Sequence, residues 1–318
     1  MPSSLTMVFL FIFCLESLAA MLQNGFMVTV LGRQWVRRQA LSTGDTIVAC
    51  IATTRFCVHG VAMLNGLLSS FDFCFLLLNI FWDFLNVFSF WLTAWLAVFY
   101  CVKISSFSHP TFFWLKWRIS RAVHRLMLGS LIICSLTAIS SVFGNLMVIQ
   151  MIASLNACEN RTLAYKIEAF QRHYFLLHEG FTLSIPFLLF LVSTVLLMVS
   201  LCRHMVRMRD RRPGLRDPSS QAHTTALKSL VFFLIFYTSY FLSLYISTMN
   251  LKLLWGHWRM AWEVFIYSGI CLHSTILVLS SPKLRRALET RLPAPALRAR
   301  KALEDPGRRV VPLSGYQY

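Results

Sequence analysis

The sequence predicts an all-α membrane protein, a seven-transmembrane helix bundle with its N-terminus extracellular and its C-terminus cytoplasmic. Hydrophobic residues make up 57% of the 318 residues and charged residues only 14%, whereas soluble domains carry roughly 25% charged residues. Seven long apolar runs and a one-sided distribution of Lys and Arg are the other two observations behind this fold class. Together they argue against a soluble enzyme, a nucleic-acid-binding domain and a disordered regulator.

Each of the seven apolar runs is long enough to cross a bilayer, which takes about 20 helical residues. The second and third runs are separated by little more than Asp72, and the fourth, fifth and sixth contain no charged residue. No internal repeat is visible, which disfavours an inverted-repeat transporter. The predicted spans are residues 5–31, 46–71, 73–102, 126–151, 180–202, 229–250 and 260–281.

The first run reads as a retained helix and not as a signal peptide. No cation precedes it, because the first Lys or Arg of the chain is Arg33, which follows the run. A signal peptide has the opposite order, with cations before a shorter apolar region. This order predicts an N-terminus on the outside of the membrane.

The cations favour the same orientation. Of the 30 Lys and Arg residues, 24 fall in the segments predicted to lie inside and five in those predicted to lie outside, as the positive-inside rule expects. The net charge of +17 is therefore attributed to topology and to attraction toward acidic inner-leaflet lipids. Asn160, in the sequon Asn160-Arg161-Thr162, lies in a predicted outer loop and is the expected glycosylation site.

The chain is predicted to consist of a seven-transmembrane domain, residues 1–282, and a cytoplasmic tail, residues 283–318. Within the tail, Leu284, Leu288 and Leu292 share one helical face with Arg residues between them, which predicts a short membrane-surface helix over 283–292. Four prolines follow this segment, so the remainder is expected to be disordered.

Several polar residues within the spans have both a structural and a functional interpretation. Arg55 is costly in a bilayer and must pair inside the bundle, either with backbone carbonyls or with Asn24. Trp82 and Asn86 are four residues apart and share a helix face, where they could serve packing or ligand contact. Glu263, at the outer end of the last span, could receive a cationic ligand or be a solvated helix end, whereas His59 is expected to be a satisfied polar residue.

The motifs in these spans and loops resemble those of the type 2 (bitter) taste receptors, a family of G protein-coupled receptors. The resemblance extends from about residue 24 to residue 285. The matching segments are Val48-x-x-Ile51-Ala52-x-x-Arg55, Trp82-x-x-x-Asn86, Phe99-Tyr100-Cys101-Val102-Lys103-Ile104, His109-Pro110-x-Phe112, His204-x-x-x-Met208, Asp217-Pro218-Ser219-x-x-Ala222-His223-x-x-Ala226-Leu227-Lys228, His273-Ser274-x-Ile276-Leu277 and Pro282-Lys283-Leu284-Arg285. One departure is Ser281, which stands where the family has Asn before Pro-Lys-Leu.

The resemblance implies a multi-pass plasma-membrane receptor for small bitter compounds, which bind in the outer half of the helix bundle. It implies activation of a gustducin-like heterotrimeric G protein, leading to phospholipase C and calcium release. Neither an enzymatic activity nor a cofactor, metal or nucleic acid is expected, and the sequence leaves homo- or hetero-oligomers open. The alternative is a polytopic transporter or channel.

The resemblance also implies roles for individual residues. Trp82 and Asn86 are the expected ligand contacts, and Asn24, Arg55 and His273 form the expected structural and activation hub. Glu263 joins the expected ligand contacts because of its position and charge, apart from the resemblance. The residues expected to face the G protein are Lys103, His204, His223, Ala226, Leu227 and Lys228.

Cys74 and Cys158 are the remaining candidates for a structural role. Both lie on the predicted outer side, where disulfides persist, and rhodopsin-like receptors commonly link this loop to the third span. Bitter receptors as a family usually lack the pair. The sequence therefore leaves open a disulfide bridge or two unlinked thiols.

Overall fold

All regular secondary structure in the described part of the chain is helical. The computed structural model describes residues 4–38, 40–67, 72–105, 110–158, 161–211, 218–248 and 257–290. Seven of the helices in these ranges are long and apolar enough to cross a membrane, which confirms the predicted seven-helix, all-α class. The predicted orientation of the two termini stays a prediction. In chain order the elements are α1 Ser4–Arg38, α2 Thr43–Leu67, α3 Asp72–Ile104, α4 Pro110–Cys158, α5 Arg161–Arg211, α6 Pro218–Thr248, α7 His257–Ser280 and α8 Pro282–Glu289.

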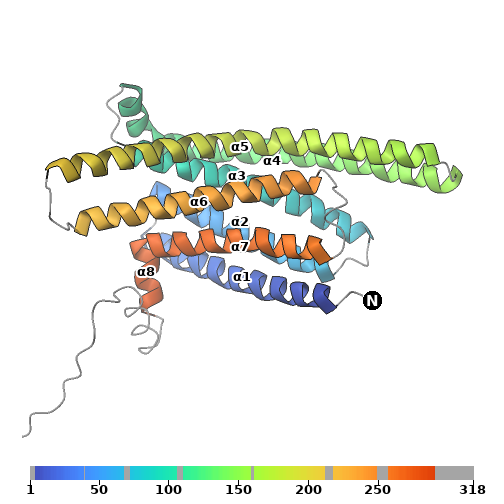
Figure 1. Cartoon of the computed structure of the whole chain (residues 1–318), viewed down its shortest axis with the longest axis horizontal. Helices are drawn as coiled ribbons and strands as arrows, with labels where there is room; N and C mark the ends of the chain where they lie inside the picture. Colours follow the sequence, from blue (N-terminus) through green and yellow to red (C-terminus); the bar gives the residue numbers. More distant parts are fainter. Residues whose placement is uncertain are drawn as a thin grey trace, which may run out of the picture. The chain divides into compact units, whose positions relative to one another are not determined.

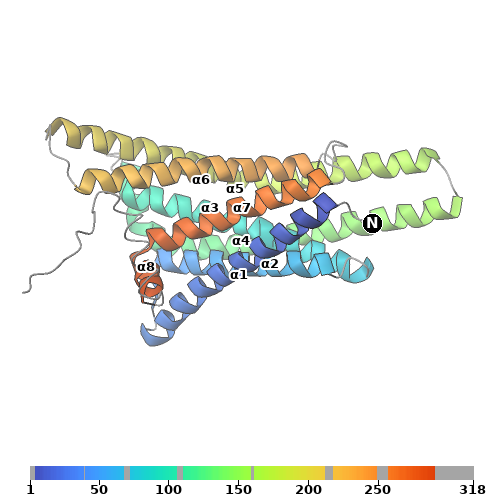
Figure 2. The ribbon, with the colours of Figure 1, turned by 60° about the horizontal axis from the view of Figure 1, so that its bottom comes forward.

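Helices α4 and α5 are far longer than the apolar runs that predicted them. They contain 49 and 51 residues, about 75 Å each at 1.5 Å per residue, whereas the hydrocarbon core of a bilayer is about 30 Å thick. Figures 1 and 2 both show them side by side and extending past the other helices at one end. Counting apolar residues gives only the part inside the hydrocarbon, because a helix does not end where its surroundings become polar.

Helix α3 is the centre of the packing. It contacts α2, α4 and α5, and its residues Leu85, Val87, Phe90, Trp91 and Ala94 belong to the main buried apolar cluster. The same cluster also includes Phe190 of α5 and Tyr240 of α6. A residue on α3 can therefore meet partners from most of the other helices.

Helices α1 and α4 have the opposite character. Only 17% of an 18-residue apolar stretch of each is buried, the same share as in α6, against 50% for α2 and α3. Leu22 on α1 and Phe143 on α4 are 69% and 64% exposed. Exposed large apolar side chains over most of a long helix fit a surface that contacts lipid.

The chain divides into two compact units, Met1–Ile276 and Leu277–Tyr318, so that the boundary falls within α7. The division predicted at residue 282 stays a prediction. In the second unit, Ser281 is the N-cap of α8 and its Oγ accepts from the Leu284 N–H at 3.5 Å. The membrane-surface position predicted for this segment also stays a prediction.

Candidate functional site

Three residues of α3, each one turn from the next, form one line of hydrogen-bonding groups within the bundle. Trp82 Nε1 donates to Tyr267 Oη of α7 at 2.9 Å. One turn further along, Asn86 Oδ1 accepts from the hydroxyl of Tyr240 of α6. Another turn on, the carbonyl oxygen of Phe90 accepts from Tyr237 of α6 at 3.3 Å. Tyrosines of α6 and α7 thus bind a single face of α3.

Tyr267 connects this line to the first two helices. Its ring packs edge-on against Phe13 of α1, with centroids 5.0 Å apart, and against His59 of α2, at 5.1 Å. It is only 6% exposed. Glu263 lies one turn earlier on α7, partly buried, and close enough for its carboxylate to interact electrostatically with the Tyr267 phenol. Trp82 and Glu263 therefore flank the same tyrosine.

The Asn86 side chain is buried among aromatic residues. Its exposed fraction is 3%, and the ring of its partner Tyr240 stacks on Phe90 with centroids 5.1 Å apart. A carboxamide in such an environment needs its hydrogen bonds, because a buried polar group left unpaired costs about 1–3 kcal/mol. The pair can thus tie α3 to α6, or exchange its bond for one to a polar ligand.

A second polar group joins α1, α2 and α7. Arg55 is 4% exposed and its Nη1 donates to Ser274 Oγ at 3.1 Å. Ser274 in turn donates to Asn24 Oδ1 at 3.2 Å, and Asn24 Nδ2 donates to the Ala20 carbonyl at 2.8 Å. Arg55 therefore reaches Asn24 through a serine, and not directly as one sequence interpretation expected.

The two buried histidines beside this group contact aromatic rings. The ring of His273 stacks on Phe233 of α6, with centroids 3.8 Å apart and planes within 11°. Within the described residues its Nδ1 has no hydrogen-bond partner, and neither ring nitrogen of His59 has one. The sequence predicted that His59 is a satisfied polar residue. That prediction is wrong, because its ring nitrogens have no hydrogen-bond partner among the described residues.

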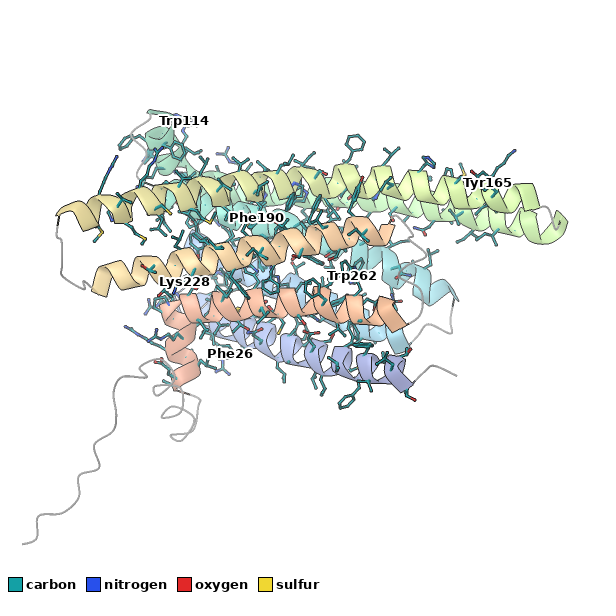
Figure 3. All side chains as sticks on the ribbon, viewed as in Figure 1. Phe26, Trp114, Tyr165, Phe190, Lys228 and Trp262 are labelled. Carbon is teal, nitrogen blue, oxygen red and sulfur yellow. The ribbon has the colours of Figure 1, made fainter. Side chains whose placement is uncertain are left out.

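The residues expected to face a G protein lie where α3 and α5 end and α6 begins. Lys103, His204, Ala226 and Lys228 are exposed and Leu227 is partly exposed, while the side chain of His223 lies outside the described residues. Figure 3 shows Lys228 near this end of the helices and Trp262 near the other end. Glu263, which follows Trp262 in the sequence, therefore lies at a different depth of the bundle from the candidate partner surface.

The remaining predicted sites fall outside what the structure describes. Asn160 lies between α4 and α5 in the undescribed part, and the side chains of Cys74 and Cys158 are not described. The glycosylation site and the disulfide stay predictions. Among the described residues there is no group of three or more His, Cys, Asp or Glu that could hold a metal ion.

Three residues of this site were given no role in the sequence analysis: Tyr240, Tyr267 and Ser274. Each hydrogen-bonds to a residue that was predicted, namely Asn86, Trp82 and Arg55. A signal was present on α7, because Glu263, Tyr267 and Ser274 recur at intervals of four and seven residues and so share one helical face. Reading the polar residues of each span by helical phase could have found them.

Comparison with known proteins supplies a family. A family model described as "Taste receptor protein (TAS2R)" matches residues 1–294. The chain is 62% identical to taste receptor type 2 member 62 of Pan paniscus over 292 residues, covering 91% of this chain and 94% of that relative. It is 56% identical to member 134 of Rattus norvegicus, covering 90% and 86%, and 41% identical to member 16 of Homo sapiens, covering 91% and 98%.

Proposed function

Because this chain belongs to the type 2, or bitter, taste receptor family of G protein-coupled receptors, we propose that it detects small extracellular bitter compounds and activates a gustducin-like heterotrimeric G protein. The signal then passes to phospholipase C and calcium release. The receptor acts as a multi-pass protein of the plasma membrane, and its task is ligand-dependent signalling and not catalysis.

The observation that carries the proposal is the line of hydrogen bonds between α3 and the tyrosines of α6 and α7. A bitter agonist contacts Trp82, Asn86 and Glu263, offering an aromatic surface, a carboxamide and a carboxylate. Many small amphipathic molecules can use such a set, since the rings accept apolar surface and the polar groups fix orientation. Glu263 favours agonists that carry a cationic nitrogen.

The agonist acts by its differential affinity for two arrangements of the helices. When it takes up the Asn86 carboxamide, the hydroxyl of Tyr240 loses its acceptor, and the tie between α3 and α6 weakens. Tyr240 lies on α6, 12 residues after Lys228, about 18 Å along the helix. A change in the position of α6 is thereby carried to the G protein surface formed by Lys103, His204, His223, Ala226, Leu227 and Lys228.

The hub of Asn24, Arg55 and His273 holds the other side of the bundle. Its bonds run from α2 through Ser274 of α7 to α1, so they provide a fixed frame against which α6 moves. His273 contacts α6 through Phe233, which links the frame to the mobile helix.

A calcium-imaging screen tests the proposal. Cells expressing the receptor with a promiscuous Gα subunit are exposed to a broad panel of bitter compounds, and surface expression is measured in the same cells. We expect concentration-dependent calcium responses to some compounds, absent from cells without the receptor. Silence across the panel, with normal surface expression, would contradict the proposed function.

A further inference from the structure

We propose that Arg55, together with His59 and Ser274, forms a buried binding site for a small inorganic anion of the chloride class. The site goes beyond the proposed function, because it is distinct from the bitter-agonist contacts and concerns the charge of the hub itself.

The first reason is an unbalanced charge. Arg55 is 4% exposed and makes one hydrogen bond within the described residues, to Ser274, whereas a guanidinium carries five N–H donors. Its Nε has no acceptor among those residues. A buried charge normally requires a partner of opposite sign, since an isolated ion is very costly in an apolar medium.

The second reason is the set of groups that surround the guanidinium. The titratable side chains that interact with it electrostatically are the phenols of Tyr237 and Tyr240 and the imidazoles of His59 and His273. None of these is a carboxylate. These partners therefore do not balance the positive charge of Arg55.

The third reason is the course of the hydrogen bonds that start at Arg55. Ser274 Oγ accepts from Arg55 and donates to Asn24 Oδ1. The Asn24 amide nitrogen is bound to the Ala20 carbonyl. None of these bonds involves the Arg55 Nε donor, which has no acceptor among the described residues.

His59 supplies a second donor on the same face of α2. It is one turn from Arg55, fully buried at 0% exposure, and neither ring nitrogen has a partner among the described residues. A neutral imidazole always carries one N–H, so His59 and Arg55 each present a donor from positions i and i+4, whose Cβ atoms lie about 5–6 Å apart. Two N–H donors and one positive charge select an anion and disfavour a metal cation.

Thermal unfolding of the purified full-length receptor tests this site. The unfolding midpoint is measured while chloride replaces gluconate at constant ionic strength, because an anion that binds only the folded state raises stability in a saturable way. We expect a saturable rise with chloride and with bromide. Arg55→Gln should abolish this rise, whereas Arg33→Gln, at an exposed arginine of α1, should retain it.

Further measurements keep the test decisive if Arg55→Gln fails to fold. His59→Phe preserves the charge of Arg55 but removes a donor, and we expect chloride to bind about tenfold more weakly, which corresponds to a loss of about 1.4 kcal/mol. Crystals grown in bromide should show anomalous density beside Arg55. An unfolding midpoint equal in chloride and gluconate, a chloride response unchanged in His59→Phe or Arg55→Gln, or bromide density only elsewhere would each overturn the proposal.

Discussion

At the scale of single residues, the site depends on pairs of polar groups that are buried together. Asn86 and Tyr240 come from helices 154 positions apart in the sequence, and both side chains are less than a tenth exposed. Each side chain provides the hydrogen-bond partner of the other at a position that water does not reach. Removing one partner therefore takes this hydrogen bond from the other, and we expect both receptor stability and agonist response to fall.

The pair gives a prediction that separates agonist contact from structural support. Tyr240→Phe leaves the Asn86 carboxamide in place, whereas Asn86→Ala removes a group that an agonist could use. We expect Asn86→Ala to lower agonist potency by about tenfold, with Tyr240→Phe lowering it less. Potency is measured by calcium response in cells matched for surface expression.

Two outcomes would contradict a contact between Asn86 and the agonist. If Asn86→Ala reaches the surface normally and every agonist keeps its wild-type potency, Asn86 serves only to hold α3 to α6. An equal loss in Asn86→Ala, Tyr240→Phe and the double variant would indicate a shared structural role.

At the scale of elements, α4 and α5 approach each other at Gly144. The Tyr174 hydroxyl donates to the Ser140 carbonyl at 2.6 Å, and its ring stacks between Phe170 and His178. A Cβ added at Gly144 would lie 2.1 Å from Tyr174 Cε1. Because the ring is held by this bond and both stacks, it cannot yield easily, and only glycine fits.

This contact predicts opposite outcomes for two Gly→Ala changes in α4. Gly144→Ala should lower the thermal unfolding midpoint, since overpacking costs about 1–3 kcal/mol. Gly129 has no atom within 4 Å of the same position, so Gly129→Ala should leave the midpoint unchanged or raise it through helix propensity. A Gly144→Ala receptor as stable as Gly129→Ala would show that α4 and α5 are less closely packed.

The connection between α4 and α5 raises a second question at this scale, the pairing of Cys74 and Cys158. We predict that a bridge between them would fix the end of α4 to the start of α3. Cys74→Ser and Cys158→Ser should then impair expression or agonist response equally, and the double variant should be no worse than either. Mass spectrometry of surface-purified receptor that finds both thiols free would exclude the bridge.

At the scale of the whole molecule, the family match and the apolar periodicity end in the same region. The family model covers residues 1–294, and α8 ends at Glu289. The sequence beyond Leu292 is rich in proline and has no apolar repeat. It therefore offers no face that could dock on a helix bundle.

We accordingly predict that the C-terminal tail is dispensable for coupling. Truncation after Leu292 should leave agonist-evoked calcium signals at wild-type amplitude and potency, measured at equal surface expression. As a control, Lys228→Glu in the surface proposed to meet the G protein should reduce the response by reversing a charge. A truncated receptor that reaches the surface but fails to signal would contradict the prediction.

The sequence by itself determined that this protein is a seven-helix membrane receptor of its family. Hydropathy is a local property, so apolar runs and their flanking cations can be read along the chain. The rarity of Arg55 in a span and the spacing of Trp82 and Asn86 are local as well, and each is recognisable from the order of residues alone. Ser281 stands where the family has Asn, and both residues cap helix N-termini about equally well, so its N-cap role agrees with the sequence.

Only the tertiary structure decided which residues meet. Tyr240, Tyr267 and Ser274 bind residues 154, 185 and 219 positions away, and that choice depends on how each helix is rotated about its axis. The lengths of α4 and α5 were also decided there, because Tyr174, which precedes the apolar run of α5, is held by its bond to Ser140. The bonding of Arg55 likewise emerged only in the folded bundle, where its Nη1 donates to Ser274 and its Nε has no acceptor among the described residues.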